Sequence, residues 1–199
     1  MKKGYNVIIS GVGGQGIILA SELLALAAME AGYDVKKSEV HGMSQRGGDV
    51  VSHVRFSDKV YSPLIEQGTC DLILAFEKAE ALRYLHYLKP ENGVVVMNDL
   101  EIIPLPVTAG EDTYPENIEE TIKKFANLVL VNAIDRAREL GNPRVANTIM
   151  LGVASKFFDI PEDVWLKVIT NRVPRKTIEV NTKAFKLGRS IAEAELSMK

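Results

Sequence analysis

The stretch YNVIISGVGGQG, residues 5–16, decides the fold class of this chain. Its first half is rich in isoleucine and valine and predicts a strand at Tyr5–Ser10. Its second half is a Gly-x-Gly-x-x-Gly turn at Gly11–Gly16, which opens a helix expected from about Gly16 to Ala31. That helix is apolar on nearly all sides, which is typical of a buried helix. A strand, a glycine turn and a buried helix in this order indicate an α/β fold.

The remaining chain continues the alternation of strands and helices. Further strands are expected at Asp34–Val40, Val50–Phe56, Asp71–Phe76, Val94–Met97 and Asn127–Val131. Helices are expected between the Asp71–Phe76 strand and Pro90, over Val145–Phe158, from Pro161 onward, and from about Lys176 to Leu196. The segment Leu100–Asn117 holds three prolines and little periodicity, so we expect a long excursion on the surface.

These elements predict one domain spanning residues 1–199. Asp71–Phe76 is a nearly continuous apolar run, as expected for a central parallel strand. The predicted architecture is a Rossmann-like open, mostly parallel sheet flanked by helices, with a helical C-terminal region.

Composition limits the possible partners. The chain has 199 residues, 46% of them hydrophobic and 25% charged, which is typical of a globular protein with a core. Its formal net charge of −2 argues against nucleic acid, because binding phosphates requires clustered lysine and arginine. No apolar run reaches the roughly 20 residues of a membrane-spanning helix, and the start of the chain does not resemble a signal peptide. We therefore expect a cytoplasmic protein without membrane contact.

A metal site is not expected in this chain. The only cysteine, Cys70, is expected to be a small buried residue beside the Asp71–Phe76 strand. An iron–sulfur cluster usually needs four thiolates. His53 and His86 have no plausible metal-binding neighbours in the sequence and are expected to be structural. If the protein takes part in electron transfer, its metal centres belong to a partner.

The glycine turn is the first candidate site. Its candidate cofactor-binding residues are Gly11, Gly13, Gly14, Gln15 and Gly16. Gly11 permits a tight turn, Gly13 leaves room for a ligand, and Gly16 lets the helix lie close to the strand, while the helix N-terminus offers N–H groups to an anion. Three interpretations remain open: contact with an anion or cofactor, tight packing without a ligand, and NAD binding.

NAD binding makes one further demand on the sequence. An acidic residue is needed about 20 positions further on, at the end of the second strand, to bind the ribose hydroxyls. Asp34 and Glu39 lie near that distance, but Asp34 precedes the strand and Glu39 follows Lys36 and Lys37. Neither residue is well placed for that role.

The second candidate site is the polar, glycine-rich tract that follows the second strand. Its candidate residues, expected to face a partner or a cofactor, are His41, Ser44, Gln45, Arg46, Gly47 and Gly48. The tract should emerge at the same edge of the sheet as the glycine turn, where open α/β sheets bind ligands. Arg46 beside two glycines could present a planar donor to a phosphate or carboxylate, and His41 could titrate near neutral pH. A simple turn is the alternative.

The two tracts together resemble the γ-type subunit of 2-oxoacid:ferredoxin oxidoreductases. The sequence HGMSQRGG, residues 41–48, is similar to the indolepyruvate branch, where this unit is called the β subunit. Pyruvate and 2-oxoglutarate relatives keep only the Arg-Gly-Gly. Support comes from DLILAFE at residues 71–77 and from GNPRVAN at residues 141–147 with Leu151-Gly152 after it. The resemblance covers nearly the whole chain.

The resemblance implies a complex that oxidatively decarboxylates an arylpyruvate with coenzyme A, giving acyl-CoA, CO2 and reduced ferredoxin. It implies a large subunit that holds thiamine diphosphate, Mg and the iron–sulfur clusters. The present sequence lacks cluster cysteines and a Gly-Asp-Gly thiamine motif, since Gly47-Gly48-Asp49-Val50 is not one. No catalytic residue and no tightly bound cofactor are therefore expected in this chain, and its glycine loops are expected to face the partner or coenzyme A.

Two other classes of protein remain as alternatives. One is a stand-alone NAD(P)-dependent oxidoreductase, which would need a ribose-binding carboxylate and an acid or base near the nicotinamide. The other is a nucleotide-binding regulator without enzymatic activity. Nicotinamide nucleotide binding by the purified chain would favour the first of these.

Overall fold

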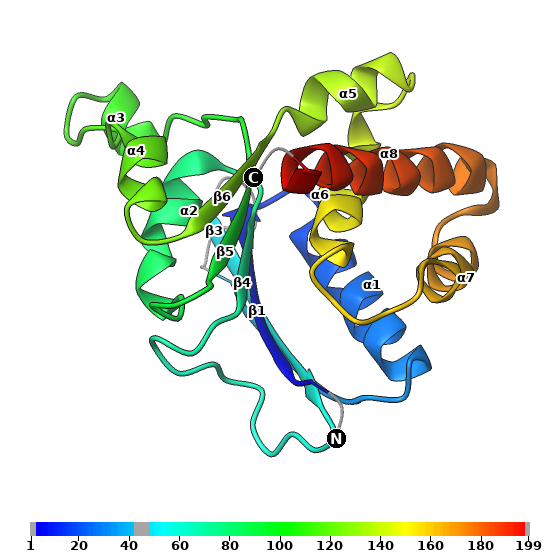
Figure 1. The fold of residues 1–199 in the computed structure, drawn as a ribbon. Helices are drawn as coiled ribbons and strands as arrows, with labels where there is room; N and C mark the ends of the chain where they lie inside the picture. Colours follow the sequence, from blue (N-terminus) through cyan, green and yellow to red (C-terminus); the bar gives the residue numbers. More distant parts are fainter. Residues whose placement is uncertain (1–2, 42–47, 198–199) are drawn as a thin grey trace.

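The computed structural model describes residues 3–41 and 48–197, which form one sheet between two layers of helices (Figure 1). Within these residues the sheet has six strands in the order β2-β3-β1-β4-β5-β6. The strands are β1 (Tyr5–Val12), β2 (Asp34–His41), β3 (Asp49–Ser57), β4 (Leu72–Ala75), β5 (Val94–Asn98) and β6 (Asn127–Val131). The pairs β1–β4, β4–β5 and β5–β6 are parallel, while β3 pairs antiparallel with both β1 and β2. Only β3 therefore runs against the other strands of the described sheet.

Helices cover both faces of the sheet, and they differ in length. One face carries α1 (Ile17–Glu30), α6 (Ala146–Ser155), α7 (Glu162–Arg172) and α8 (Ile178–Ser197), and we call it the α1 face. The opposite face carries α2 (Lys78–Arg83) and α4 (Ile118–Lys123), and we call it the α2 face. The remaining elements are α3 (Leu105–Thr108), α5 (Ala133–Glu139) and the 3-10 turns η1 (Leu85–Tyr87), η2 (Pro143–Val145) and η3 (Arg175–Thr177).

The architecture confirms the predicted α/β class, with a mostly parallel sheet and a helical C-terminal region. Several boundaries differ from the prediction. The strand β1 continues through Gly11 and Val12, because both residues pair with β3. The helix expected over Val145–Phe158 is shorter, since α6 ends at Ser155. Pro161 precedes α7 as its N-cap and is not its first helical residue.

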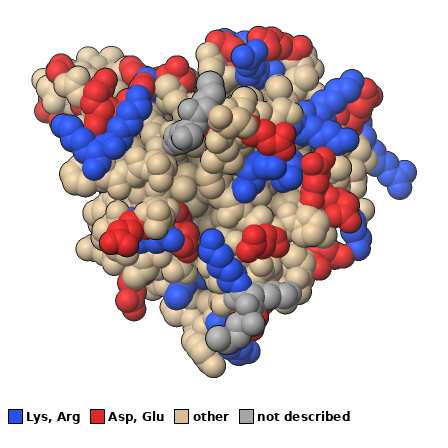
Figure 2. Space-filling view, in the orientation of Figure 1, with Lys and Arg blue, Asp and Glu red and all other residues tan. Residues whose placement is uncertain are grey.

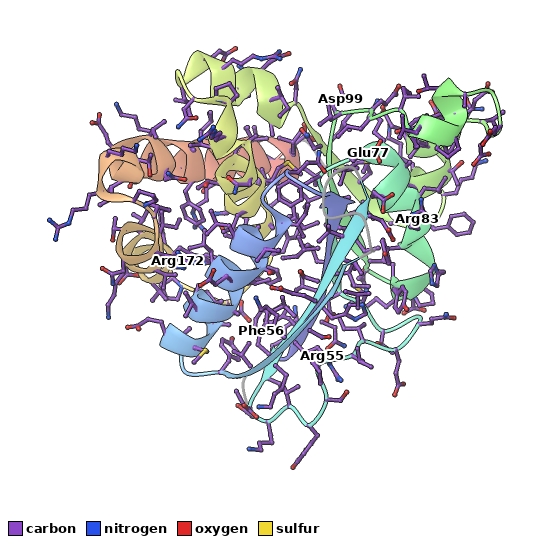
Figure 3. The ribbon with its side chains drawn as sticks, turned by 180° about the vertical axis from the view of Figure 1, so that it is seen from behind. Arg55, Phe56, Glu77, Arg83, Asp99 and Arg172 are labelled. Carbon is purple, nitrogen blue, oxygen red and sulfur yellow. The ribbon has the colours of Figure 1, made fainter. Side chains whose placement is uncertain are left out.

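Alternating side chains of the central strand supply both cores. Leu72 and Leu74 of β4 contribute to the core on the α1 face, whereas Ile73 and Ala75 contribute to the core on the α2 face. The same alternation is visible on β3, where Phe56 and its neighbour Arg55 point to opposite sides of the sheet (Figure 3). A central strand that is buried on both faces must be apolar throughout, which is why this run was recognisable in the sequence.

On the α1 face, α6 and α8 cross at two glycines. A Cβ added at Gly188 would lie 2.1 Å from the carbonyl oxygen of Ile149, and one added at Gly152 would lie 2.2 Å from the carbonyl oxygen of Phe185. The two helix backbones can be this close only because neither crossing residue has a side chain. The start of α6 lies against the start of α1 at the carboxyl edge of the sheet, where Asn147 meets Gly16.

The α2 face is closed by irregular segments as well as by short helices. Arg55 donates from Nε to Asn6 Oδ1 at 2.9 Å and from Nη1 to the carbonyl oxygens of Ser62 and Leu64, which fastens the segment after β3. His53 is buried and accepts a hydrogen bond at Nδ1 from the backbone N–H of Ile65, at 3.1 Å. Polar side chains thus hold the loops of this face against the sheet.

Two properties bear on the environment of the protein: the distribution of charge on its surface and the length and apolarity of its helices. On the side seen in Figure 2, acidic and basic side chains are interspersed, without a broad area of one sign. Among the described residues, no helix is both long and apolar enough to cross a membrane.

Candidate functional site

The glycine turn lies at the carboxyl edge of the sheet, between β1 and α1. The left-handed conformation falls on Gly14 at φ 105° and Gly16 at φ 85°, a region that favours glycine. Gly11 was predicted to permit the tight turn, but it lies outside the turn. It is a buried residue of β1, where an added Cβ would lie 2.9 Å from Cβ of Phe76 and 2.6 Å from Oε1 of Gln15. The first glycine therefore serves packing, and the last two serve the turn.

Gln15 is engaged within the protein. Its Oε1 accepts a hydrogen bond from the N–H of Val12 at 2.7 Å, and its Nε2 donates to the carbonyl oxygen of Phe76 at 2.9 Å. The side chain therefore ties the turn to the end of β4 and holds its shape. The side chain thus has a positioning role, and the part of Gln15 in cofactor binding stays a prediction.

The second glycine-rich tract ends beside the glycine turn. The N–H of Gly13 donates to the carbonyl oxygen of Gly48 at 2.9 Å, and Val12 is paired with Asp49 in the β1–β3 ladder. The predicted residues Ser44, Gln45, Arg46 and Gly47 lie outside the described residues, as does the side chain of His41. The Gly48 end of the tract meets the turn at the carboxyl edge of the sheet, as the sequence predicts.

The neighbouring strand ends are tightly fastened. Asn98, at the end of β5, is 2% exposed, donates from Nδ2 to the carbonyl oxygen of Phe76 at 3.2 Å and accepts from the N–H of Ala133 at 3.0 Å. The carbonyl oxygen of Phe76 therefore accepts from both Gln15 and Asn98. These bonds join the ends of three strands to the glycine turn and make this edge a preorganised surface.

Glu77 fastens the long excursion to the same edge. It is 1% exposed, and its Oε2 caps α2 by accepting from the N–H of Glu80 at 2.9 Å. Its Oε1 accepts from the hydroxyl of Tyr114 and from the N–H of Ile102 at 3.2 Å. Burial and the carboxylate of Glu77 raise the pKa of the Tyr114 hydroxyl. The sequence contained Glu77 within a recognised tract but offered no signal for its hold on the excursion, since Ile102 and Tyr114 lie 25 and 37 residues away.

Charged groups around Glu77 are paired. Lys78 Nζ lies 2.7 Å from a carboxylate oxygen of Asp99 and 3.4 Å from those of Glu101 and Glu119, and the hydrogen bond to Asp99 raises the pKa of Lys78. Glu77 and Asp99 lie near one another at this edge (Figure 3). These ion pairs connect α2 with α4 and with the segment after β5, so the charged groups have a structural role.

Glu80 is the other buried carboxylate of α2. Burial raises its pKa, and the partner that opposes this is Arg83, whose Nε lies 3.1 and 3.2 Å from the two carboxylate oxygens. In Figure 3 the Arg83 side chain projects from α2 on the side of the sheet that carries Glu77. Glu80 and Arg83 thus form an ion pair within α2.

Asn147, the second residue of α6, is a polar residue of this edge that sequence reasoning did not single out. It is 6% exposed, and a Cβ added at Gly16 would lie 2.5 Å from its Nδ2. Its side chain thus occupies the space that glycine leaves free at the N-cap of α1. The recognised tract at residues 141–147 contained it, but only the packing of α6 on α1 brings it to the turn.

The geometry required for NAD binding is not met in the described strands. In the dinucleotide fold the strand after the first helix lies directly beside the first strand. Here β3 is inserted between β1 and β2, so the acidic candidates Asp34 and Glu39 lie on an edge strand. Asp34 accepts from Lys36 Nζ at 2.9 Å and from the N–H of Val60 at 2.9 Å, and Glu39 accepts from Lys37 at 2.5 Å.

Cys70 and the two described histidines have structural surroundings. Cys70 is fully buried, and burial raises the pKa of its thiol to about 12, as fits a packing residue. Burial also lowers the pKa of His53, which favours the neutral ring that accepts from Ile65. His86 is exposed on η1 beside Tyr87. The predictions of structural roles for Cys70 and His53 agree with these contacts.

The fold and this edge together define a class: an α/β domain whose uncapped β1–α1 glycine turn is joined to the β2–β3 hairpin. The chain belongs to the pyruvate ferredoxin/flavodoxin oxidoreductase family, whose model matches residues 6–191.

Relatives within the family are similar over almost their whole length. The indolepyruvate oxidoreductase subunits IorB of Thermococcus kodakarensis and Pyrococcus horikoshii are each 42% identical to this chain, over 98% of it and 100% of the relative. The 2-oxoglutarate synthase subunit KorC of Methanocaldococcus jannaschii is 30% identical, over 97% of this chain and 96% of the relative. These similarities confirm the resemblance to the indolepyruvate branch.

Solved structures agree with the fold. The γ subunit of a keto/oxoacid ferredoxin oxidoreductase from Geobacter sulfurreducens matches with a TM-score of 0.71 and 30% identity, over 96% of this chain and 99% of that one. The 2-oxoglutarate:ferredoxin oxidoreductase of Magnetococcus marinus, solved with 2-oxoglutarate, coenzyme A and succinyl-CoA, matches with a TM-score of 0.77 and 25% identity. This chain corresponds to 32% of that longer chain, and 98% of this chain is covered.

Proposed function

We propose that this chain is the small subunit of a cytoplasmic, thiamine-dependent complex that oxidatively decarboxylates arylpyruvates, indolepyruvate among them. The complex would use coenzyme A and ferredoxin and would give acyl-CoA, CO2 and reduced ferredoxin. The observation that carries the proposal is the match, over 98% of this chain, to subunits named for indolepyruvate oxidation. The bond between Gly13 and Gly48 also supports the proposal, because it brings two glycine-rich segments together at the carboxyl edge, where open α/β sheets bind ligands.

The donor set of the chain supports a division of labour. The single cysteine is buried with a raised thiol pKa, so this chain does not supply the thiolates of an iron–sulfur cluster. Thiamine diphosphate, Mg and the clusters would belong to a large partner subunit, where they would supply carbanion stabilisation and electron transfer. This chain would contribute no reacting group and would complete the binding site.

Coenzyme A is the ligand that we place at the shared site. Its phosphates suit the N-terminus of α1, where Gly16 is the N-cap, no side chain caps the helix and no acidic residue occupies the first turn. Gly14 is exposed, and an added Cβ would have no neighbour within 4 Å, so a ligand could approach the backbone. The tract residues His41, Ser44, Gln45, Arg46, Gly47 and Gly48 would face the partner or coenzyme A.

Co-expression with a candidate large subunit tests the proposal. An anaerobic pull-down of the tagged chain should recover a partner that contains thiamine and clusters, and the pair should reduce ferredoxin in the presence of indolepyruvate and coenzyme A. Within that complex, Arg46→Ala should raise the KM for coenzyme A several-fold, with Arg175→Ala on the exposed η3 turn as the matched control. A chain recovered alone, inactive with 2-oxoacids, would overturn the proposal.

A further inference from the structure

A hollow of about 550 Å³ lies on the α2 face, lined by residues at the end of α2, from η1 to Pro90, and just after α4. Three leucines, Leu82, Leu85 and Leu88, line it together with the ring of Phe125. Its volume falls within the range of small-molecule sites, which are mostly apolar and have a few polar groups that orient the ligand. The hollow therefore has the size and the lining of a ligand pocket.

This hollow lies at the opposite edge of the sheet from the glycine turn. Lys89 and Pro90 precede β5, and Lys124 and Phe125 precede β6. Because β4, β5 and β6 run parallel to β1, the starts of these strands form the amino edge, whereas the glycine turn follows the end of β1. A ligand in the hollow would be separate from one at the candidate functional site.

Phe125 is an aromatic side chain that the two cores do not use. It is 62% exposed and belongs to neither core of the described chain, although it directly follows the C-cap of α4. Leu88 is only 7% exposed, and Leu85 packs against the core of the α2 face. An apolar body between Phe125 and these leucines would remove from water a surface that folding leaves exposed, which is favourable in proportion to the area buried.

The titratable side chains of the lining are all basic: His86, Lys89 and Lys124. Lys89 Nζ is held by a carboxylate oxygen of Asp71 at 2.6 Å. Lys124 is exposed, and its ammonium group has no ion pair or hydrogen bond within the part of the chain that the structure describes. One unpaired ammonium beside apolar walls complements a ligand that has an apolar body and a single negative charge.

The size of the apolar surface favours a small molecule over a protein partner. A stable protein interface buries roughly 800 Å² of each partner. Among the described residues that line this hollow, Phe125 is the single large hydrophobic residue that is exposed, since the leucines are partly or fully buried. So small an exposed apolar area suits a ligand of one ring or two.

We propose that this hollow binds a small aromatic carboxylate, with its ring between Phe125 and the leucines and its carboxylate at the ammonium of Lys124. An aromatic ring gains from stacked or edge-to-face contact with phenylalanine, and a carboxylate accepts a charge-assisted hydrogen bond from an ammonium. His86, exposed on η1, adds a second polar group to the lining. The inference does not depend on the proposed function, because the two sites lie at opposite edges of the sheet.

Calorimetric titration of the full-length chain with indole-3-acetate tests the site. Binding should be saturable, with a dissociation constant below about 1 mM. Indole-3-acetamide, which keeps the ring but has no charge, and acetate, which keeps the charge but has no ring, should each bind at least about tenfold more weakly. Absence of binding, or equal binding of the acetate and the acetamide of indole, would overturn the inference.

NMR of the isotopically labelled chain locates the bound probe. The methyl signals of Leu82 and Leu85 and the backbone signal of Phe125 should shift with indole-3-acetate. The signals of Gly14 and Gly16 should stay in place, because they lie at the other edge of the sheet. Shifts confined to the glycine turn would refute the assignment to the hollow.

Substitutions provide a second readout. Lys124→Gln should weaken binding of indole-3-acetate about tenfold and leave binding of indole-3-acetamide unchanged. The matched control is Lys123→Gln, because this adjacent, exposed lysine pairs with Glu119 and lies outside the lining. Phe125→Ala should weaken both indole probes about fivefold, since each loses the same ring contact. Equal effects of the two lysine variants would mean general attraction of anions and would contradict the role of Lys124.

Recovery of the partner separates a ligand site from a protein-docking face. Lys124→Glu should leave recovery of the large subunit unchanged, because the hollow is open to a small molecule. Loss of recovery would make the hollow a docking face for an acidic partner and would overturn the inference. If no partner or 2-oxoacid activity is found but the chain binds indole-3-acetate through Lys124, the proposed function fails and this inference stands.

Discussion

The two faces of the sheet are closed in different ways. On the α1 face, long helices pack through apolar side chains, and α6 meets α8 at Gly152 and Gly188 with almost no space between the backbones. On the α2 face, the helices are short and buried polar groups such as Glu77 and His53 hold irregular segments in place. Long helices bury enough apolar surface to be positioned by shape, whereas loops must be positioned by hydrogen bonds because their backbone groups lack regular partners.

The candidate site lies at the edge of the sheet where the α1 face and the α2 face meet. The α1 face contributes Gly16 and Asn147, which are placed by helix packing, and the α2 face contributes Glu77, which is placed by hydrogen bonds. Substitutions on the two faces should therefore differ in size and kind. The following predictions test that difference, beginning with the largest expected effect.

Gly188→Ala should cause the largest loss of stability. The added Cβ would lie 2.1 Å from the carbonyl oxygen of Ile149 and 2.9 Å from the backbone nitrogen of Val153, so α6 and α8 would have to separate. We expect the free energy of unfolding to fall by about 3 kcal/mol or more, measured by denaturant titration. Gly141→Ala is the control: it has a φ of 79° but no neighbour near the Cβ, and should cost about 1 kcal/mol. Similar losses for the two variants would mean that close helix contact does not position the α1 face.

Glu77→Ala should have the next largest effect, and on the α2 face. It would leave the N–H groups of Ile102 and Glu80 and the hydroxyl of Tyr114 without their acceptor. We expect a loss of about 2–3 kcal/mol. Limited proteolysis should also cut faster within Leu100–Asn117, which an effect on packing alone would not produce. Glu116→Ala, at an exposed position of the same segment, should leave both measurements near those of the wild-type chain.

Gly16→Ala tests the junction of the faces and should cost about 2 kcal/mol. Its φ of 85° strains any residue with a Cβ, and the added atom would also meet Asn147. Gly14→Ala, at φ 105° in open space, should cost only the strain, about 1 kcal/mol. In a double-mutant cycle, Asn147→Ala should relieve part of the cost of Gly16→Ala. Strict additivity of the two substitutions would show that the contact between them carries no energy.

The smallest effect should come from the titration of His53. Burial lowers its pKa in the folded chain, so the unfolded chain binds the proton more readily. Neutral His53 therefore favours folding above about pH 6.5, and the free energy of unfolding should decline as the pH falls from there towards the folded-state pKa. His53→Gln should make this decline shallower in denaturant titrations between pH 5 and pH 7.5. The exposed His86→Gln should leave the slope as it is in the wild-type chain; an equal change in both variants would remove His53 as the cause.

Much of the architecture could be predicted because it depends on patterns among residues that are close together in the sequence. The apolar run at Asp71–Phe76 marks a strand buried on both faces, and β4 lies in the middle of the sheet with Cys70 packed beside it. The prediction of β6 at Asn127–Val131 matches the structure residue for residue. The glycine turn could be placed between a strand and a helix because glycine positions and hydrophobic periodicity are both properties of neighbouring residues.

The roles within the turn could not be assigned from the same pattern. Gly11 was expected to make the bend, yet it is a strand residue crowded by Phe76, and the left-handed conformations fall on Gly14 and Gly16. Gln15 is a candidate cofactor-binding residue in the sequence, and only the structure shows that both ends of its amide are bound to the backbone of Val12 and Phe76. The spacing of glycines predicts where a turn lies. Only the neighbours in space determine which glycine adopts the left-handed conformation and which one is required for close packing.

The sequence alone therefore determined the fold class, the family resemblance and the position of the glycine turn, because each follows from residues close together in the chain. Only the tertiary structure decided that antiparallel β3 separates β1 from β2, that Gly48 bonds to Gly13, and that Asn147 packs on Gly16. The physical reason is range. The pairing of β3 with β1, the bond between Gly13 and Gly48, and the contact of Asn147 with Gly16 each join groups more than 30 residues apart, which meet only when the whole chain has folded.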